Sequence, residues 1–194
     1  MAKRPTQNIT AQSLAGHLLI ATPAVQDFCF NRSVIYLCSH TETGAMGVIV
    51  NYPVKELQMN QIYEQLDISN ETNSHHFPIH FGGPVEANRG FIIHSSEFEA
   101  EGSLIEMNGI SVSASLGLLK AIAAGKGPRS GMLVLGYAGW SSGQLESEIE
   151  SGSWMVVPAT KELVFGAVNE TKWDRAIATL GIDMGHFSGD VGHA

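Results

Sequence analysis

The sequence has little cysteine, little charge and no long hydrophobic run. Cys29 and Cys38 are the only cysteines among 194 residues, so a disulfide scaffold is excluded and the reducing cytoplasm is the expected compartment. No run of about 18 apolar residues occurs, so neither a membrane-spanning helix nor a membrane partner is expected. Residues 1–12 carry two basic side chains with no apolar stretch behind them, which predicts a polar arm rather than a signal peptide.

The charge balance is acidic. Charged residues make up 15% of the chain, the formal net charge is -8, and hydrophobic residues make up 44%. Nucleic-acid phosphates are bound by clustered Lys and Arg, so no direct nucleic-acid partner is expected. The hydrophobic content and length favour one domain over residues 13–194, and the 21 glycines indicate many turns and close backbone approaches.

Hairpins with interspersed helices dominate the pattern, which predicts an α+β fold. The pair Asn108-Gly109 is typical of a tight hairpin turn, because both of its central positions need a positive φ. Expected strands are 16–21, 33–39, 46–50, 90–94, 104–106, 110–112, 132–135, 153–157 and, more weakly, 163–165. Expected helices are 54–67, 116–124, a short one from about 142 to 151, and one beginning at Asn169.

The stretch 131–154 combines several local signals. Residues 132–135 are apolar and lie between Gly131 and Gly136, which predicts a buried strand that ends in a tight turn. Ser141 and Gln144 have capping-box spacing, so a helix is expected to start at about residue 142. Gly152 is its expected end.

Several motifs are distributed over nearly the whole chain. They are LAGHLLIATP, FNRSVIYLCSH, GAMGVIVN, GGPV, RGFIIH, GYAGW, GQLESEI and the closing GHA. Together they resemble the YqgE/AlgH family of bacterial proteins. The resemblance implies a cytosolic protein with a single domain, in which a bifurcated, mostly antiparallel β-sheet forms a pseudo-barrel with flanking helices. It also implies no established catalytic activity, and no cofactor is expected.

The AlgH name carries a regulatory association with alginate production, and some proteins of this kind are labelled transcriptional regulators. The acidic balance and the absence of a basic recognition helix argue against a direct operator reader. If regulation occurs, we expect it to act indirectly, through a protein partner or a sensed small molecule.

A pocket for a small anion or polar ligand is the preferred functional hypothesis. Backbone N–H groups at Gly82-Gly83 and at the start of the helix near residue 142 would donate to a carboxylate or phosphate, and Arg32 would add a forked contact. The predicted site comprises Arg32, Asn51, Gly82, Gly83, Trp140, Gln144 and Glu146. A purely structural interpretation stays open, in which the glycines form a turn, Arg32 pairs with Glu146 or Glu148, and Trp140 packs against the helix.

Enzyme chemistry is the more distant alternative. Residues 139–143 fit G-x-S-x-G, which would make Ser141 the nucleophile of a serine hydrolase. The acid and histidine that this chemistry needs would have to come from Asp174, Asp183 or Asp190 with His186 or His193. Ser141 is also explained as a helix cap, so no catalytic residue is assigned.

Thiol and metal chemistry receive weaker support. Cys38 and His40 would share one face of a strand, as in a reactive thiolate, but a small buried cysteine beside a turn histidine is the favoured interpretation. His75, His76 and His80 straddle Pro78, and His40 and His94 with Glu146 and Glu148 lack diagnostic spacing. No metal site is expected.

Overall fold

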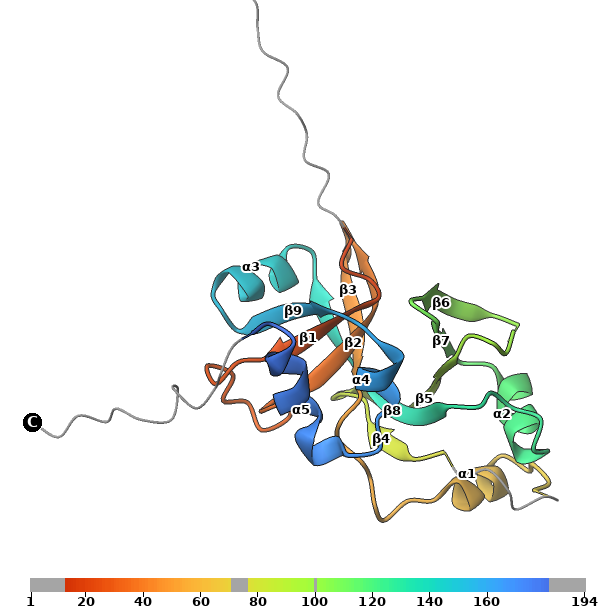
Figure 1. Ribbon diagram of the computed structural model, residues 1–194. Coiled ribbons are helices and arrows are strands. Elements are labelled where there is room, and N and C mark those ends of the chain that lie inside the picture. Colours follow the sequence, from red (N-terminus) through yellow and green to blue (C-terminus); the bar gives the residue numbers. More distant parts are fainter. Residues whose placement is uncertain (1–12, 71–76, 100, 182–194) are drawn as a thin grey trace, which may run out of the picture.

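The computed structural model describes residues 13–70, 77–99 and 101–181, which form a curled β-sheet and short helices (Figure 1). The strands are β1 His17–Ala21, β2 Val34–Thr41, β3 Gly44–Ile49, β4 Ile79–Phe81, β5 Val85–Ser95, β6 Ser103–Met107, β7 Ile110–Ser113, β8 Gly131–Ser141 and β9 Trp154–Pro158. The helices are α1 Met59–Gln65, α2 Leu116–Ala123, α3 Gln144–Glu150, α4 Lys161–Phe165 and α5 Asn169–Ala178. None of these helices is long and apolar enough to cross a membrane.

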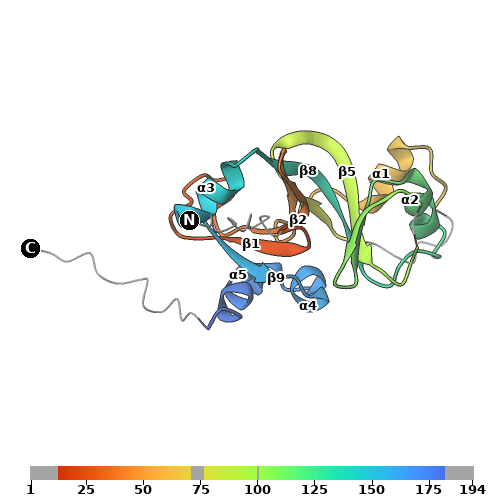
Figure 2. The same cartoon turned by 90° about the horizontal axis from the view of Figure 1, so that it is seen from above.

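The strands lie in the order β6-β7-β5-β8-β3-β2-β1-β9, with β4 paired to β8 beside this path. All pairings are antiparallel except that between β4 and β8. The sheet curls into an open half-barrel, with α4 and α5 on one side and α1 and α2 towards its far end (Figures 1 and 2). The expected α+β fold with a bifurcated antiparallel sheet is confirmed.

The bifurcation lies in the middle of β8. One edge of β8 pairs with β5, whereas the other edge pairs first with β4, at Leu133 to Leu135, and then with β3, from Ala138 onward. The change of partner surrounds Gly136, whose φ is +75°. The backbone there adopts a conformation that glycine accepts without strain. The strand expected over 132–135 is therefore longer and continues to Ser141, and the expected tight turn before the helix follows at residues 142–143.

Gly82 and Gly83 lie immediately after β4, at the point where β8 changes its partner from β4 to β3, which we call the fork. The Gly82 N–H donates to the Leu135 carbonyl at 2.7 Å, and the Gly82 carbonyl accepts from the Ile49 N–H at 2.9 Å. A Cβ on Gly82 would lie 2.3 Å from the Gly136 oxygen, and one on Gly83 would lie 2.2 Å from the Tyr137 carbonyl carbon. The two glycines therefore let separate strands approach β8 closely.

Both faces of the central strands are buried, because successive residues of a strand face opposite cores. Leu18 and Ile20 of β1 face the inner core, which α4 and α5 cover, whereas Leu19 faces an outer core beneath α3. Ile92 of β5 faces a further core under α1 and α2. This two-sided burial explains why several strands are continuous apolar runs in the sequence.

Two expected helix and strand assignments are corrected. The helix expected over 54–67 is shorter, because Pro53 bridges His80 and the Val54 N–H donates to the Ile79 carbonyl, so the chain is strand-like before α1. The weak strand expected at 163–165 belongs to helix α4, whose N-cap Thr160 accepts a hydrogen bond from the Leu163 N–H at 3.2 Å.

The start of the central helix also differs from expectation. Helix α3 begins at Gln144 rather than near residue 142, and its N-cap is Gly143 with φ 74°. Only one arm of the expected capping box forms, in which the Gln144 Oε1 accepts from the Ser141 N–H at 3.0 Å. Ser141 is the last residue of β8 instead of a helix cap. The expected hairpin turn at Asn108-Gly109 is confirmed, with φ values of 57° and 75°.

The close approach at the fork makes a testable prediction. Gly82→Ala is expected to destabilise the protein by about 3 kcal/mol or more, because the new methyl group would meet backbone atoms that have no rotamer to move aside. Gly139→Ala is the control, since a Cβ there meets nothing nearer than the Tyr137 ring at 3.5 Å. Denaturant unfolding of both variants measures the difference, and equal stability would contradict the packing argument.

Candidate functional site

Trp140 and Gln144, two of the predicted site residues, lie where the end of β8 meets α3, a region that we call the Trp140 corner and that an internal hydrogen-bond network closes. Glu148 Oε2 accepts from the indole N–H groups of Trp140 at 2.8 Å and Trp154 at 2.7 Å. Glu148 Oε1 accepts from the Gln144 amide at 2.9 Å. The two indole rings pack edge to face with their centroids 6.0 Å apart. Trp140 and Gln144 are thus brought together, but they serve the packing of α3 on the sheet.

Ser141 has a local partner at this corner. Its hydroxyl donates to the Gln144 Oε1 at 3.1 Å. Of the acids considered for a triad, Asp174 is engaged with Arg32, while Asp183, Asp190, His186 and His193 lie outside the described residues. The observed environment of Ser141 therefore contains a structural hydrogen bond and no histidine contact among the described residues.

Arg32 and Asn51 lie on another part of the molecule. The Arg32 guanidinium contacts both carboxylate oxygens of Asp174 at 2.9 Å and stacks 4.1 Å from the Trp173 ring centroid. The pairing with Glu146 or Glu148 that the structural interpretation considered is therefore wrong. The buried Asn51 accepts from the Val34 N–H at 2.8 Å and donates to the Arg32 carbonyl at 2.9 Å. These bonds fasten the backbone at the start of β2.

The remaining predicted residues occupy further positions. Gly82 and Gly83 pack on β8 at the fork. The Glu146 Oε1 accepts from the His40 Nε2 at 2.8 Å, while the His40 Nδ1 accepts from the Leu14 N–H at 3.0 Å. The seven residues are therefore spread over four positions: the fork, the Trp140 corner, the Arg32–Asp174 pair and the His40–Glu146 pair.

Cys38 has the character of a core thiol. It is buried inside the sheet, and burial raises its pKa to about 12. A thiol in that state carries almost no thiolate at neutral pH. His40 bonds to Leu14 and Glu146 instead of the thiol.

Within the described residues, no group of three or more His, Cys, Asp or Glu side chains is arranged to hold a metal ion, and His75 and His76 lie outside them.

A more polar hollow lies where β4 meets the start of α5, a region seen beside β8 in Figure 1. Its volume is about 360 Å³. The polar side chains that line it are His80, Arg129, Ser130, Asn169 and Lys172. We refer to it as the His80–Lys172 hollow.

Lys172 is the most unusual of these residues. It is 1% exposed, and its Nζ donates to the carbonyl oxygens of Val50 at 2.7 Å and Val164 at 2.8 Å. None of the four ion pairs among the described residues involves it. Burial, with a smaller effect of the Arg175 charge, lowers its pKa to about 8. A buried ammonium that has no carboxylate partner among the described residues is costly, and a negative charge beside it would lower that cost.

His80 lies on β4 opposite Val134 and is 1% exposed. Its Nε2 lies 3.2 Å from the Asn169 Oδ1, and its Nδ1 has no hydrogen-bond partner among the described residues. Burial is the main reason that its pKa falls to about 4, and the Lys172 charge lowers it further. Hydrogen bonds with Asn169 and with the Pro78 backbone act in the opposite direction but do not offset burial. The imidazole is therefore neutral at pH 7, with its Nε2 proton directed at the Asn169 Oδ1 and its Nδ1 without a proton.

The first turn of α5 and Arg129 complete the donor set. The N-cap of this ten-residue helix, Val168, provides no side-chain cap, and Asn169 follows it. N–H groups of a first helical turn lack partners within the helix and favour anions. Arg129 is exposed at the rim, and its backbone N–H donates to Glu97 at 2.7 Å. The hollow thus combines two cationic side chains with a helix N-terminus.

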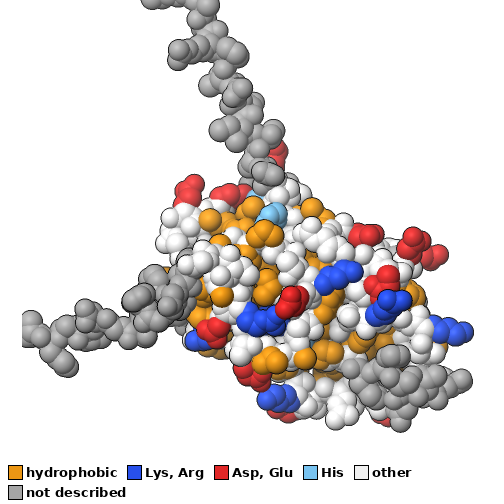
Figure 3. Space-filling view, in the orientation of Figure 1, with side chains coloured by type: hydrophobic (Ala, Val, Ile, Leu, Met, Phe, Trp, Pro, Cys, Tyr) orange, Lys and Arg blue, Asp and Glu red, His pale blue; other side chains and the backbone are white. Residues whose placement is uncertain are grey.

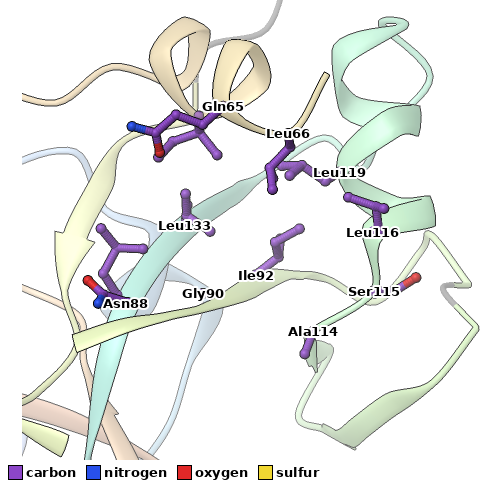
Figure 4. A pocket seen from close by; sticks show the side chains of 12 residues that line it. Gln65, Leu66, Asn88, Gly90, Ile92, Ala114, Ser115, Leu116, Leu119 and Leu133 are labelled. Atoms are coloured by element: carbon purple, nitrogen blue, oxygen red, sulfur yellow. The ribbon is translucent and has the colours of Figure 1, made fainter. Parts of the chain in front are cut away.

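A second hollow lies between α1 and α2 and is mostly apolar (Figure 4). Its volume is about 260 Å³, and Figure 4 shows Ile92, Leu119 and Leu133 around it. Gln65, Asn88 and Ser115 are its polar residues, and it has no charged side chain. The chemistry available there is limited to apolar contact with a few neutral hydrogen bonds.

Sequence reasoning considered His80 only as part of a histidine cluster and did not select Lys172. One signal was present, because Lys172 precedes Trp173 and lies four residues before Ala176, on the apolar stripe of its helix. A lysine in such a position is expected to be buried or to extend past the core. The partner His80 is 92 positions away in the sequence and could be found only in the structure.

A family model and several bacterial relatives match this chain over most of its length. The family model described as AlgH-like matches residues 18–185. A UPF0301 protein of Afipia carboxidovorans is 47% identical over 93% of this chain and 90% of its own, and one of Methylobacterium nodulans is 44% identical over 98% and 94%.

Two solved structures are also similar. The solution structure of the AlgH protein from Pseudomonas aeruginosa matches with a TM-score of 0.76 and 36% identity, covering 100% of both chains. The crystal structure of DIP2367 from Corynebacterium diphtheriae matches with a TM-score of 0.70 and 23% identity, covering 90% of this chain and 91% of its own, a likeness of fold alone.

The Glu148 network predicts a large effect on stability. Glu148→Ala is expected to cost about 3 kcal/mol, because it leaves the largely buried Trp140 and Trp154 N–H groups without their acceptor. Glu150→Ala, an exposed glutamate on the same helix, is the control and is expected to change stability by less than about 0.5 kcal/mol. Chemical denaturation compares the two, and similar losses would show that the network does not stabilise the corner.

The neutral His80 predicts a loss of stability in acid. Its folded pKa of about 4 lies below the ordinary value of 6.5, so between these pH values the unfolded chain binds a proton that the folded protein does not. The free energy of unfolding is therefore expected to fall by up to ~3 kcal/mol as the pH drops from 6.5 to 4. Denaturant titrations of the native protein and His80→Gln test this, because the variant should lose less stability over that interval; identical slopes would rule His80 out as the cause.

Proposed function

The chain belongs to the AlgH-like family, and we propose that it is a binding module for a small anionic ligand, held at the His80–Lys172 hollow. The carrying observation is the buried Lys172 ammonium, which is held by two backbone carbonyls and by no carboxylate among the described residues. A bound carboxylate or phosphate would supply the missing counter-charge. Because the Lys172 side chain is buried, that contact would be stronger than one at the surface.

The other groups at the hollow suit the same ligand. Arg129 can approach from the rim with a forked guanidinium, and the first turn of α5 offers backbone N–H donors. The His80 Nδ1 is an acceptor, so it suits a hydroxyl or N–H group on the ligand rather than the anionic group itself. The arrangement supports a ligand that carries one negative group and one hydrogen-bond donor.

The ligand class is the one expected from the sequence, a small anion, but the site lies at the His80–Lys172 hollow and not at the residues that the sequence predicted. The earlier location depended on Arg32 and Gln144, whose side chains make internal bonds to Asp174 and Glu148. The Gly82 N–H likewise donates within the sheet. The His80–Lys172 hollow has the more suitable chemistry, because the Lys172 ammonium there has only neutral partners among the described residues.

A protein that binds a small anion could also regulate transcription indirectly, through a protein partner. We keep this as the second candidate function. On the face shown in Figure 3, Lys and Arg side chains of the described residues alternate with Asp and Glu and form no continuous basic surface. Nucleic-acid phosphates would find little attraction there. We place the protein in the cytoplasm as part of the same proposal, which is supported by the free thiols of Cys29 and Cys38.

Thermal unfolding with added phosphate, sulfate or small carboxylates tests the proposed function. A ligand at about 100 times its Kd adds about 2.7 kcal/mol to the stability of the folded state, or roughly 5–10 °C in Tm for a chain of this size. Lys172→Met and Arg129→Ala should remove or greatly reduce the increase. Lys126→Ala is the matched control, since this exposed lysine lies near Arg129 in sequence but outside the hollow.

Two results would contradict the proposal. The first is an unchanged Tm of the native protein across the whole set of anions. The second is an increase that persists in full in both Lys172→Met and Arg129→Ala, which would place the bound anion elsewhere.

A further inference from the structure

Among the described residues, the Lys172 Nζ has two hydrogen-bond acceptors, which are enough for the two N–H groups of the neutral amine that exists beside the predominant ammonium form. An ammonium group has three N–H donors, whereas a neutral amine has two donors and one lone pair. The carbonyl oxygens of Val50 and Val164 take two donors, at 2.7 and 2.8 Å. When the amine is neutral, both N–H groups are satisfied and the lone pair is left over. That is the arrangement of a nucleophilic lysine.

We propose that Lys172 reversibly forms an imine with the carbonyl group of a small 2-oxo carboxylate bound in the His80–Lys172 hollow. The inference rests on the proposed anion site, because the carboxylate of the ligand takes the place of the anion. Arg129 and the first turn of α5 would share the carboxylate with Lys172, which lines the same hollow, and the adjacent carbonyl carbon would then lie beside the amine.

The step balances without a redox partner. The Nζ lone pair attacks the carbonyl carbon, a C–N bond forms, and the carbonyl π electrons move to oxygen. One proton moves from nitrogen to that oxygen and gives a carbinolamine. The nitrogen lone pair then expels this hydroxyl group, which leaves as water with a second proton lost from nitrogen. The product is a C=N bond to Lys172 and one molecule of water.

His80 suits the proton transfers of this step. It is buried beside Lys172, and its unpaired Nδ1 can receive a proton from the amine and return it to the departing hydroxyl group. Asn169 holds the ring through Nε2 at 3.2 Å. The imidazole thus has one nitrogen fixed by the protein and one available to the reaction.

The electrostatic surroundings keep part of the amine neutral. Arg175 on the same helix acts on the charge of Lys172, His80 on β4 lies close enough to sense that charge, and Arg129 lines the same hollow. The lowered pKa of Lys172, about 8, leaves roughly a tenth of the amine neutral at pH 7. An ordinary exposed lysine has a far smaller neutral fraction, so Lys172 should react first.

Reductive trapping tests the inference. The full chain is incubated with pyruvate and sodium cyanoborohydride, which reduces an imine to a stable amine, and is then analysed by intact mass and peptide mapping. One reduced pyruvyl group is expected on Lys172, with a yield at least tenfold above that of any other lysine. The yield should rise with pH and level off above about pH 8, in keeping with the neutral fraction of the amine.

Lysine variants and competition by phosphate distinguish an imine at Lys172 from unspecific labelling of lysines. Lys172→Met should lose the label, whereas Lys126→Arg should keep it. Inorganic phosphate should protect Lys172 in the native protein, a measurement that needs no folded Lys172 variant. Labelling spread evenly over the exposed lysines, or an unlabelled Lys172, would overturn the imine. If phosphate still raises the Tm of the native protein while Lys172 stays unlabelled, the imine fails and the anion site stands; if both measurements are negative, both fail.

Discussion

The close contact of Gly82 and Gly83 with the middle of β8 is the constraint on which the rest of the structure depends. At this point one edge of β8 exchanges β4 for β3, and three backbone segments meet with distances that a Cβ on Gly82 or Gly83 would not permit. The positive φ of Gly136 turns the strand as it passes between its two partners. The half-barrel curls around this fork, so its inner and outer cores are defined by where the strands separate.

The same contact fixes the candidate site. His80 is two residues before Gly82 on a strand of three residues, and the parallel register with Val134 sets which way its side chain faces. Helix α5, which provides the other wall of the hollow, is held by Trp173. This residue packs in the inner core and donates its indole N–H to the Ala21 carbonyl at 2.8 Å. Lys172, next to Trp173, is thereby carried into the interior. The hollow exists because a short strand and a short helix are both fixed at their ends by the core.

Two groups of buried polar side chains differ in how completely they are hydrogen-bonded within the protein. At the Trp140 corner, one carboxylate accepts from two indoles and an amide, so its polar atoms are used within the protein and the arrangement stabilises the fold. At the His80–Lys172 hollow, an acceptor is unpaired and a cation has only neutral partners among the described residues. Buried polar groups in proteins are usually hydrogen-bonded, and a buried cation usually has an anionic partner, so a ligand that supplies these contacts would be stabilised here. This difference in pairing is the physical reason for assigning the site to the hollow rather than to the corner.

Sequence alone determined the family, the α+β class, the β2–β3 hairpin and the turn at Asn108-Gly109, because these depend on local periodicity, turn chemistry and motifs that a single chain displays. It ended the strand over 132–135 too early and assigned a strand at 163–165, because a glycine inside a long strand and a five-residue helix are decided by their neighbours. It also chose the wrong partner for Arg32 in the structural interpretation, since Asp174 lies 142 positions away. Only the tertiary structure could bring His80 to Lys172, because burial, and with it the lowered pKa of each group, is a property of the packed interior and not of the chain.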